Sequence, residues 1–241
     1  MTNINQLKVK LYADGADLDS MLDLYKDPNI KGFTTNPTLM KQVGITDYEK
    51  FARLVITSIP DRPVSFEVFA DDLPSMLIQA KVISSWGSNV NVKIPITNTK
   101  GEFTGPIIKE LSEEGVKLNI TAIFTTEQVK EVAKNLSQDT FAIVSVFAGR
   151  IADSGLDPMP IMRECVEILS DLPKADLLWA SPRELLNIIQ ADEVGCHIIT
   201  ATPGVLGKLK LLGKDLTEFS LETVKMFYND ATAAGYKINK R

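Results

Sequence analysis

Eight short runs of apolar and β-branched residues recur along the chain, and each is followed by a segment with helical patterning. The runs are almost continuously apolar rather than alternating, which is typical of parallel strands covered on both faces. They cover residues 9–14, 32–36, 64–69, 90–96, 117–124, 141–147, 176–181 and 196–202. The pattern therefore predicts a parallel sheet whose strands are connected by helices.

Signals for helix starts stand between these runs. Residues 46–49 and 125–128 each have the Thr-x-x-Glu/Gln spacing of a capping box, which satisfies two free backbone N–H groups at a helix start. Asn36 followed by Pro37 predicts another helix directly after the second run, with the asparagine as its N-cap.

Eight strand–helix units within 241 residues predict a single (β/α)8 barrel, also called a TIM barrel, as one domain over residues 1–241. An open doubly wound sheet is the alternative, but its usual Gly-x-Gly-x-x-Gly turn is missing. Residues 216–234 predict an additional amphipathic C-terminal helix, which has no strand of its own to cover. Its apolar stripe is formed by Leu216, Phe219, Val224 and Phe227.

Composition narrows the range of partners. The net charge of −5 disfavours nucleic acid and anionic membranes as partners. No run approaches the about 20 apolar residues of a membrane helix, and the first residues lack the apolar region of a signal peptide. Cys165 and Cys196 lie in apolar segments, which predicts free thiols in a reducing cytoplasm. A single histidine, His197, excludes a metal site built on several histidines.

Polar residues stand at or near the ends of nearly all the predicted strands, which is where a barrel of this kind carries its active site. One such residue means little, but a set spread over the barrel is difficult to explain by packing, because each member would need its own buried partner. The set contains Asp14, Asn36, Glu67, Lys93, Asn119, Thr121, Ser145, Ser181, and Thr200 or Thr202.

Lys93 lies in an otherwise apolar run, where an ammonium group is costly unless it is paired or loses its proton. Burial lowers the pKa of a lysine, and a neutral amine attacks carbonyl groups to form a Schiff base. Asp14 and Glu67 offer the two acid–base groups that imine chemistry needs. The alternative is a buried ion pair of Lys93 with one of these carboxylates.

A second polar cluster follows the sixth and seventh runs. Arg150, Ser181 and Arg183 would place two guanidinium groups and a hydroxyl on adjacent loops. Guanidinium binds phosphate in a bidentate manner, so the cluster predicts a phosphate clamp. For either arginine alone, a surface salt bridge is the alternative.

Five stretches resemble the transaldolases, in the same order and along nearly the whole chain. They are GFTTNPTLM (32–40), VNVKIPIT (90–97), NITAIF (119–124), VFAGRIAD (146–153) and LLWASPRE (177–184). The short length resembles the small subfamily that also contains fructose-6-phosphate aldolase. The resemblance implies transfer of a dihydroxyacetone unit between sugar phosphates, without a cofactor or metal, in cytoplasmic carbohydrate metabolism.

The resemblance also implies a role for each matching residue. Lys93 corresponds to the Schiff-base lysine and Asp14 to the acid–base aspartate, while Glu67 with Thr121 holds a catalytic water. The remaining residues match the substrate site: Asn36, Asn119 and Ser145 for the dihydroxyacetone part, Phe147 for the pocket wall, and Arg150, Ser181 and Arg183 for the phosphate.

Two departures keep alternatives open. Fructose-6-phosphate aldolase is similar but has glutamine and tyrosine where this chain has Glu67 and Phe147, so the chain resembles a true transaldolase more than a lyase. Pro182 lies between Ser181 and Arg183 of the phosphate site and leaves a different anionic head group as an alternative. A binding module for anionic sugars, with Lys93 merely charged and paired, is the non-enzymatic alternative.

The expected partners are sugar phosphates and further copies of the chain. The small subfamily tends toward pentamers and decamers in which the terminal helix clasps a neighbour, and residues 216–234 would be that helix here.

Overall fold

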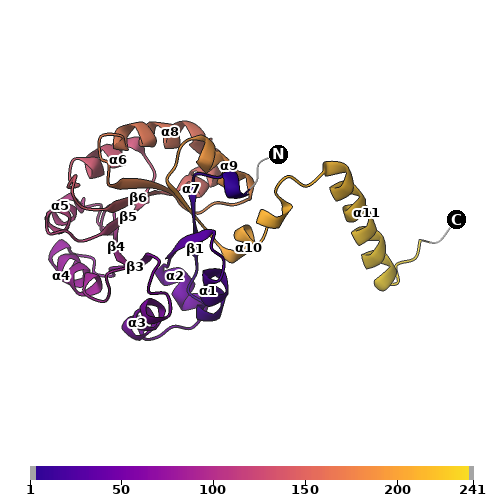
Figure 1. Cartoon of the computed structure of the whole chain (residues 1–241), viewed down its shortest axis with the longest axis horizontal. Helices are drawn as coiled ribbons and strands as arrows, with labels where there is room; N and C mark the ends of the chain where they lie inside the picture. Colours follow the sequence, from indigo (N-terminus) through magenta and orange to yellow (C-terminus); the bar gives the residue numbers. More distant parts are fainter. Residues whose placement is uncertain (1–3, 239–241) are drawn as a thin grey trace.

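The computed structural model describes residues 4–238, and its eight parallel strands close into one barrel in chain order (Figure 1). This confirms the predicted (β/α)8 barrel. The strands are β1 (Lys10–Asp14), β2 (Ile30–Thr34), β3 (Val64–Glu67), β4 (Val90–Pro95), β5 (Leu118–Ile123), β6 (Ala142–Val146), β7 (Ala175–Trp179) and β8 (Ile198–Ala201).

Helices surround the barrel, and two of them follow β2 and two follow β6 (Figure 1). The α-helices around the barrel are α1 (Leu18–Tyr25), α2 (Pro37–Gln42), α3 (Tyr48–Ser58), α4 (Leu73–Ser84), α5 (Gly105–Glu113), α6 (Thr126–Ala133), α7 (Ala148–Asp153), α8 (Pro158–Leu169), α9 (Leu186–Glu193) and α10 (Pro203–Leu206). Short 3-10 turns at η1 (Ile4–Gln6) and η2 (Leu209–Leu211) flank the barrel, and α11 (Leu216–Ala233) follows it.

Two of the three predicted helix starts are confirmed and one is wrong by a residue. Thr125 forms the capping box of α6, and Asn36 Oδ1 accepts a hydrogen bond from Leu39 N at 3.0 Å at the start of α2. The predicted cap at Thr46 is replaced by Asp47, whose Oδ1 accepts from Lys50 N at 3.0 Å. A carboxylate at an extended position caps as well as a hydroxyl, so α3 begins one residue later than the threonine signal predicts.

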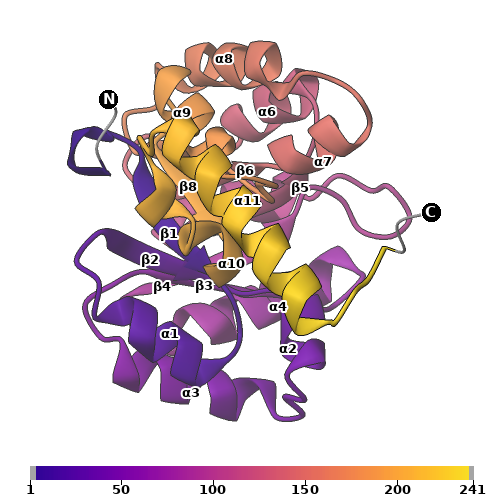
Figure 2. The ribbon, with the colours of Figure 1, turned by 90° about the vertical axis from the view of Figure 1, so that its right-hand side faces the viewer.

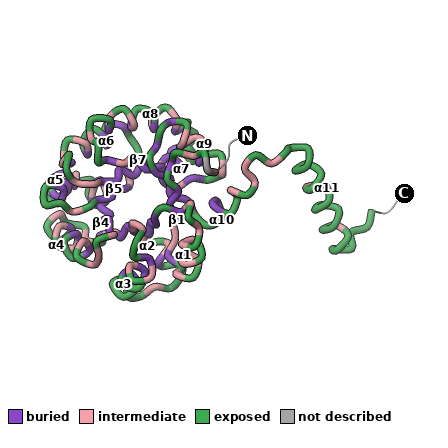
Figure 3. The backbone as a smooth tube through the Cα atoms, viewed as in Figure 1, coloured by how far each residue is buried: buried purple, intermediate pink, exposed green. Residues whose placement is uncertain are grey.

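A small apolar cluster lies apart from the main core between strands and helices. Its five buried residues are Tyr12, Ile143, Leu178, Ala180 and Ile198. Gly32 makes room for the Tyr12 ring, because a Cβ atom there would lie 2.5 Å from it. Figure 3 shows the resulting buried ring of strands. Leu178 and Ala180 of this cluster also line the cavity at the carboxyl ends of the strands.

The predicted C-terminal helix is confirmed as α11, which stands away from the barrel (Figure 1 and Figure 2). It has no buried residue, and Figure 3 shows it almost wholly exposed. Leu216, Val224 and Phe227 are 80%, 59% and 63% exposed. Within residues 4–238, no helix has the length and apolar character needed to cross a membrane.

Candidate active site

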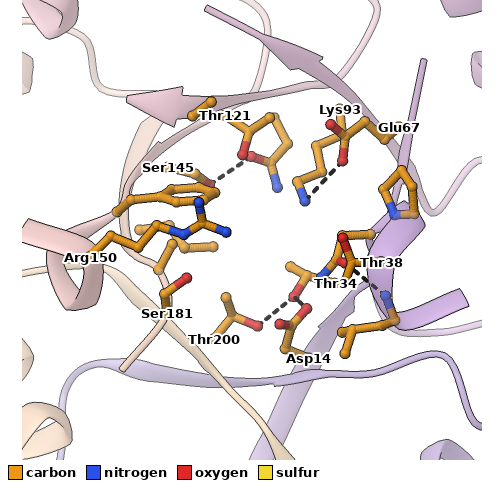
Figure 4. A pocket seen from close by; sticks show the side chains of 18 residues that line it. Asp14, Thr34, Thr38, Glu67, Lys93, Thr121, Ser145, Arg150, Ser181 and Thr200 are labelled. Carbon is orange, nitrogen blue, oxygen red and sulfur yellow. Dashed lines mark hydrogen bonds and ion pairs between the residues drawn. The ribbon is translucent and has the colours of Figure 1, made fainter. Parts of the chain in front are cut away.

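A cavity of about 450 Å³ opens at the carboxyl ends of the strands (Figure 4). It brings together all but one of the residues that the sequence predicts for the site: Asp14, Asn36, Glu67, Lys93, Asn119, Thr121, Ser145, Phe147, Arg150 and Ser181. The exception is Arg183, which does not line this cavity.

Lys93 lies on β4 and lines this cavity. Parallel pairing sets Glu67 of β3 and Asn119 of β5 directly beside it. Its side chain is 9% exposed, and Nζ lies 3.3 Å from Glu67 Oε2 and donates to Thr35 O at 3.1 Å. The ion pair left open as an alternative is therefore present in the free protein. It also supplies what an amine nucleophile needs, because a carboxylate within reach of Nζ can take its proton.

Asp14 lies at the end of β1 and faces the same cavity (Figure 4). Burial raises the pKa of the Asp14 carboxyl, while the charge of Lys93 and a hydrogen bond from Thr34 act in the opposite direction. Thr34 Oγ1 donates to Asp14 Oδ1 at 2.8 Å. A carboxylate whose pKa lies above its ordinary range is better matched to exchanging a proton near neutral pH than an ordinary aspartate.

Glu67 is fixed through its main chain by Tyr48 of α3. The Tyr48 hydroxyl accepts from Glu67 N at 2.7 Å and donates to Glu67 O at 2.9 Å. The Tyr48 ring packs edge-on against Phe66 and Phe69, which helps to hold its hydroxyl in place. Sequence reasoning missed Tyr48, because nothing in the α3 sequence marks it as a contact of β3.

Three polar side chains form a buried chain across β3, β5 and β6. Asn119 Nδ2 donates to Ser65 Oγ at 3.0 Å, and Ser145 Oγ donates to Asn119 Oδ1 at 2.7 Å. These two bonds fix the orientation of the amide, with its nitrogen toward β3 and its oxygen toward β6. Asn119 and Ser145 are therefore held in one orientation before any ligand binds.

Thr121 is the predicted site residue that has a buried polar atom without a hydrogen-bond partner among the described residues. Its Oγ1 atom is buried and has no partner within the part of the chain that the structure describes. Ala122, which follows it, has a φ of 60°, and the pairing of β5 with β6 is irregular at this point. Such a bulge re-aims side chains next to active sites, and a buried hydroxyl needs a partner, so Thr121 is suited to hold a water or a ligand hydroxyl.

Arg150 and Ser181 form the outer end of the cavity. The Arg150 guanidinium lies 5.3 Å above the Phe147 ring, and Phe147 in turn packs against Phe124 at 5.7 Å. Ser181 has a φ of 58°, and its carbonyl approaches Gly149 so closely that a Cβ atom there would lie 1.6 Å from it. The glycine therefore lets the loops after β6 and β7 interlock, which sets the cation beside the hydroxyl.

Arg183 is turned toward a different partner. Its Nε atom donates to both carboxylate oxygens of Asp153, at 2.9 and 3.1 Å, and Nη2 adds a third bond to Oδ2. The guanidinium of Arg183 lowers the pKa of Asp153. In the free protein the predicted clamp therefore presents Arg150 and Ser181 to the cavity, while Arg183 is held as a surface ion pair.

Thr34, Thr38 and Thr200 also line the cavity but had no role in the sequence prediction. The sequence marks Thr200 only as a polar residue at a strand end, with Thr202 as its alternative. Within residues 4–238 there is no group of three or more His, Cys, Asp or Glu residues that could hold a metal ion. The arrangement thus offers one amine, two carboxylates, oriented amide and hydroxyl groups, and a cation at the outer end.

The chain matches the family model described as "Transaldolase/Fructose-6-phosphate aldolase" over residues 11–240. It is 34% identical to a probable transaldolase of Nitrosopumilus maritimus, covering 89% of this chain and 92% of that protein. It is 32% identical to a probable transaldolase of a Thermoanaerobacter species, covering 95% of this chain and the whole of that protein.

Solved structures resemble the chain in fold. Dihydrodipicolinate synthase from Rhodopseudomonas palustris superimposes with a TM-score of 0.57 at 13% identity, covering 95% of this chain and 81% of that one. KGPDC from Streptococcus mutans superimposes with a TM-score of 0.54 at 12% identity, covering 82% of this chain and 88% of that one. At these identities the likeness concerns the barrel alone.

Asp14→Asn is expected to raise the free energy of unfolding at neutral pH, because it removes a charge that is costly to bury. Burial raises the folded-state pKa of Asp14 above the about 3.9 of an unfolded chain. The folded protein therefore binds the proton more tightly, and wild-type stability falls as the pH rises from the unfolded to the folded value. Urea unfolding across this pH range measures the difference between the two proteins.

The gain should be present above this window and disappear below the unfolded pKa. Asp171→Asn, at an exposed position, is the matched control and should show no such pH-dependent gain. If Asp14→Asn does not raise the free energy of unfolding at neutral pH, or raises it equally at every pH, Asp14 does not carry a buried charge.

Proposed function

The chain belongs to the transaldolase/fructose-6-phosphate aldolase family, and we propose that it is a Schiff-base transaldolase. The proposed donor is a ketose phosphate of the fructose 6-phosphate or sedoheptulose 7-phosphate type. The acceptor is an aldehyde phosphate such as glyceraldehyde 3-phosphate or erythrose 4-phosphate. The reaction moves a three-carbon dihydroxyacetone unit from one to the other and uses neither a metal nor an organic cofactor.

The observation that carries this proposal is the setting of Lys93. Its amine is almost fully buried in an apolar strand, yet it lines an open cavity and lies 3.3 Å from a carboxylate oxygen. A protein that only binds sugars gains nothing from this arrangement, because an exposed lysine would attract an anion without the desolvation cost. A covalent nucleophile requires it, since the amine must meet a carbonyl carbon out of water.

The first half of the proposed reaction builds the imine. Lys93 Nζ attacks the ketone carbon and its proton passes to Glu67. The resulting carbinolamine loses water, and Glu67 acts through a water molecule that Thr121 helps to hold. The unmet hydrogen bond of Thr121 Oγ1 supports this role. Asn36, Asn119 and Ser145 would hold the hydroxyl groups of the dihydroxyacetone part.

The second half breaks and remakes a carbon–carbon bond. Asp14 removes the proton from the hydroxyl beyond the scissile bond, and the bond electrons move into the protonated imine. An aldehyde leaves and an enamine remains on Lys93. A second aldehyde phosphate then adds, and the steps run in reverse. Asp14 faces Lys93 closely enough for its pKa to respond to the lysine charge, which supports its placement at the reacting atoms.

The head group of the substrate would bind at the outer end of the cavity. Arg150 is pre-oriented over the Phe147 ring and stands beside Ser181, so one guanidinium and one hydroxyl are ready for a phosphate. Arg183 would join them by exchanging Asp153 for the substrate. The Arg183–Asp153 pair is exposed to solvent in the free protein, and such surface ion pairs are weak, typically about 0–1 kcal/mol.

The terminal helix supports a further part of the proposal, an assembly of several copies. Residues 216–234, observed as α11 over Leu216–Ala233, present an apolar stripe that no part of their own barrel covers. An isolated helix without tertiary packing is only marginally stable in water. We propose that a neighbouring subunit covers this helix in a homo-oligomer, a pentamer or decamer as the resemblance implies.

Coupled assays that compare transfer with release test the proposed reaction. Transfer from fructose 6-phosphate to erythrose 4-phosphate is expected to exceed the release of free dihydroxyacetone. The reason is that Phe147 has no phenol that could protonate the enamine.

Glu67→Gln combined with Phe147→Tyr should move the balance toward release. Glu67→Gln with Phe124→Tyr is the matched control, because it adds a phenol to the neighbouring ring outside the cavity lining. Release that already dominates in the wild type would make the protein an aldolase.

Removal of the chain after Lys214 tests the proposed assembly. The truncated protein is expected to form a smaller assembly, because it lacks the apolar stripe that a neighbour would cover. Light scattering after size-exclusion chromatography measures the mass. In the full chain, Phe227→Asp should act in the same direction, whereas Lys225→Asp, on the opposite side of the helix, should not. Equal masses for the truncated and full proteins would show that the helix does not join subunits.

A further inference from the structure

Two threonine hydroxyls connect β8 to the Asp14 carboxylate across the inner face of β1 (Figure 4). Thr34 Oγ1 donates to Asp14 Oδ1 at 2.8 Å, and the Oγ1 atoms of Thr34 and Thr200 lie 2.6 Å apart. Thr34 and Thr200 are 3% and 5% exposed, so bulk water competes little for these bonds. The register pairs Thr34 with Asp14 itself and Thr200 with Tyr12, two residues earlier on β1.

The chemistry of a hydroxyl sets the direction of this chain. Each threonine has a single proton to donate and two lone pairs that accept. Because Thr34 donates its proton to the ionised carboxylate, its oxygen accepts at the other contact, and Thr200 is the donor there. Hydrogen bonds in series polarise one another, so the second bond strengthens the first.

We infer that Thr200 is a positioning residue that acts on Asp14 through Thr34. The two hydroxyls hold one carboxylate oxygen in place and favour the ionised form of Asp14, which is the form that removes a proton. This inference rests on the proposed function, because it takes Asp14 to be the base. It gives a role to a residue of β8, which the sequence marks only as polar at a strand end.

The same chain also fits the protonated state of Asp14. When Asp14 has taken the substrate proton on Oδ1, it becomes a donor to Thr34. Thr34 then turns its own proton to Thr200, whose oxygen accepts it. Both charge states therefore keep two hydrogen bonds without movement of the backbone. A hydroxyl pair can do this, whereas an ammonium group in place of Thr34 has no lone pair and could not accept the proton.

Other charged groups also surround Asp14, so the test must separate their effect from that of the two hydroxyls. Lys93 of β4 lowers and Glu67 of β3 raises the pKa of Asp14, and Arg150 of α7 lines the same cavity. Thr200→Val and Thr34→Val leave all three charges in place. Thr200→Ser keeps the hydroxyl and removes only a methyl group, so it separates hydrogen bonding from packing.

Two measurements on each variant test the inference. The first is the pH dependence of kcat/KM, in which the acid limb reports the ionisation of the free enzyme's base. The second is the pH midpoint of the Asp14 carboxyl carbon by NMR of protein labelled at aspartate Cγ, assigned with Asp14→Asn. The second needs no turnover, so it examines the hydroxyl chain even if the proposed reaction is absent.

Thr34→Val should move both midpoints upward by about one pH unit, because the hydrogen bond to the carboxylate is stronger than the bond that the protonated acid donates to Thr34. Thr200→Val should move them in the same direction by less, and Thr200→Ser should restore the wild-type values. Thr126→Val, at a buried threonine outside the cavity lining, is the matched control. Its midpoints should equal those of the wild type.

The inference is overturned if Thr200→Val leaves the carboxyl midpoint at its wild-type value. It is also overturned if that variant loses activity equally at every pH, because this would show a contact with substrate or simple packing. If the wild type transfers nothing, the proposed function fails, while an upward shift of the carboxyl midpoint still supports the hydroxyl chain.

Discussion

The contact between Lys93 Nζ and Glu67 Oε2 is the interaction on which the rest of the site depends. It exists because β3 and β4 are paired so that the two residues stand side by side, and because both side chains point to the inside of the barrel. An ammonium in this position without a carboxylate would be strongly destabilising. With the carboxylate, the strand tolerates the lysine, and the lysine has a group beside it that can take its proton.

The two carboxylates near Lys93 are set apart by their surroundings. Glu67 is in direct contact with the amine and has its main chain held by the Tyr48 hydroxyl. Asp14 is stabilised by a hydroxyl chain, and burial raises its pKa. Different environments allow two acids of the same kind to do different work in one cavity. The proposed division, with Glu67 serving imine formation and Asp14 serving bond cleavage, follows this difference.

The barrel and most of its site could be predicted from the sequence, because parallel strands buried on both faces have a recognisable pattern and their carboxyl ends share one face of the fold. The second strand was predicted two residues late, at 32–36. The charged Lys31 interrupts the apolar pattern at its start, and Asn36, which caps α2, was counted as part of the strand. A surface salt bridge of Arg183 stood as the alternative to the phosphate clamp, but its partner could not be predicted. The pairing depends on Asp153 at the end of α7, whose own segment carries no sign of it. The contacts of Tyr48 and Thr200 likewise arise only when distant segments meet.

The central claim is that Lys93 is a covalent nucleophile, and trapping of the intermediate tests it most directly. Borohydride would be added to the full-length protein with fructose 6-phosphate, and the modified peptide would be located by mass spectrometry. We expect irreversible inactivation with a stable adduct on Lys93, and neither adduct nor turnover in Lys93→Ala. An adduct on a different lysine, or turnover that survives in Lys93→Ala, would contradict it.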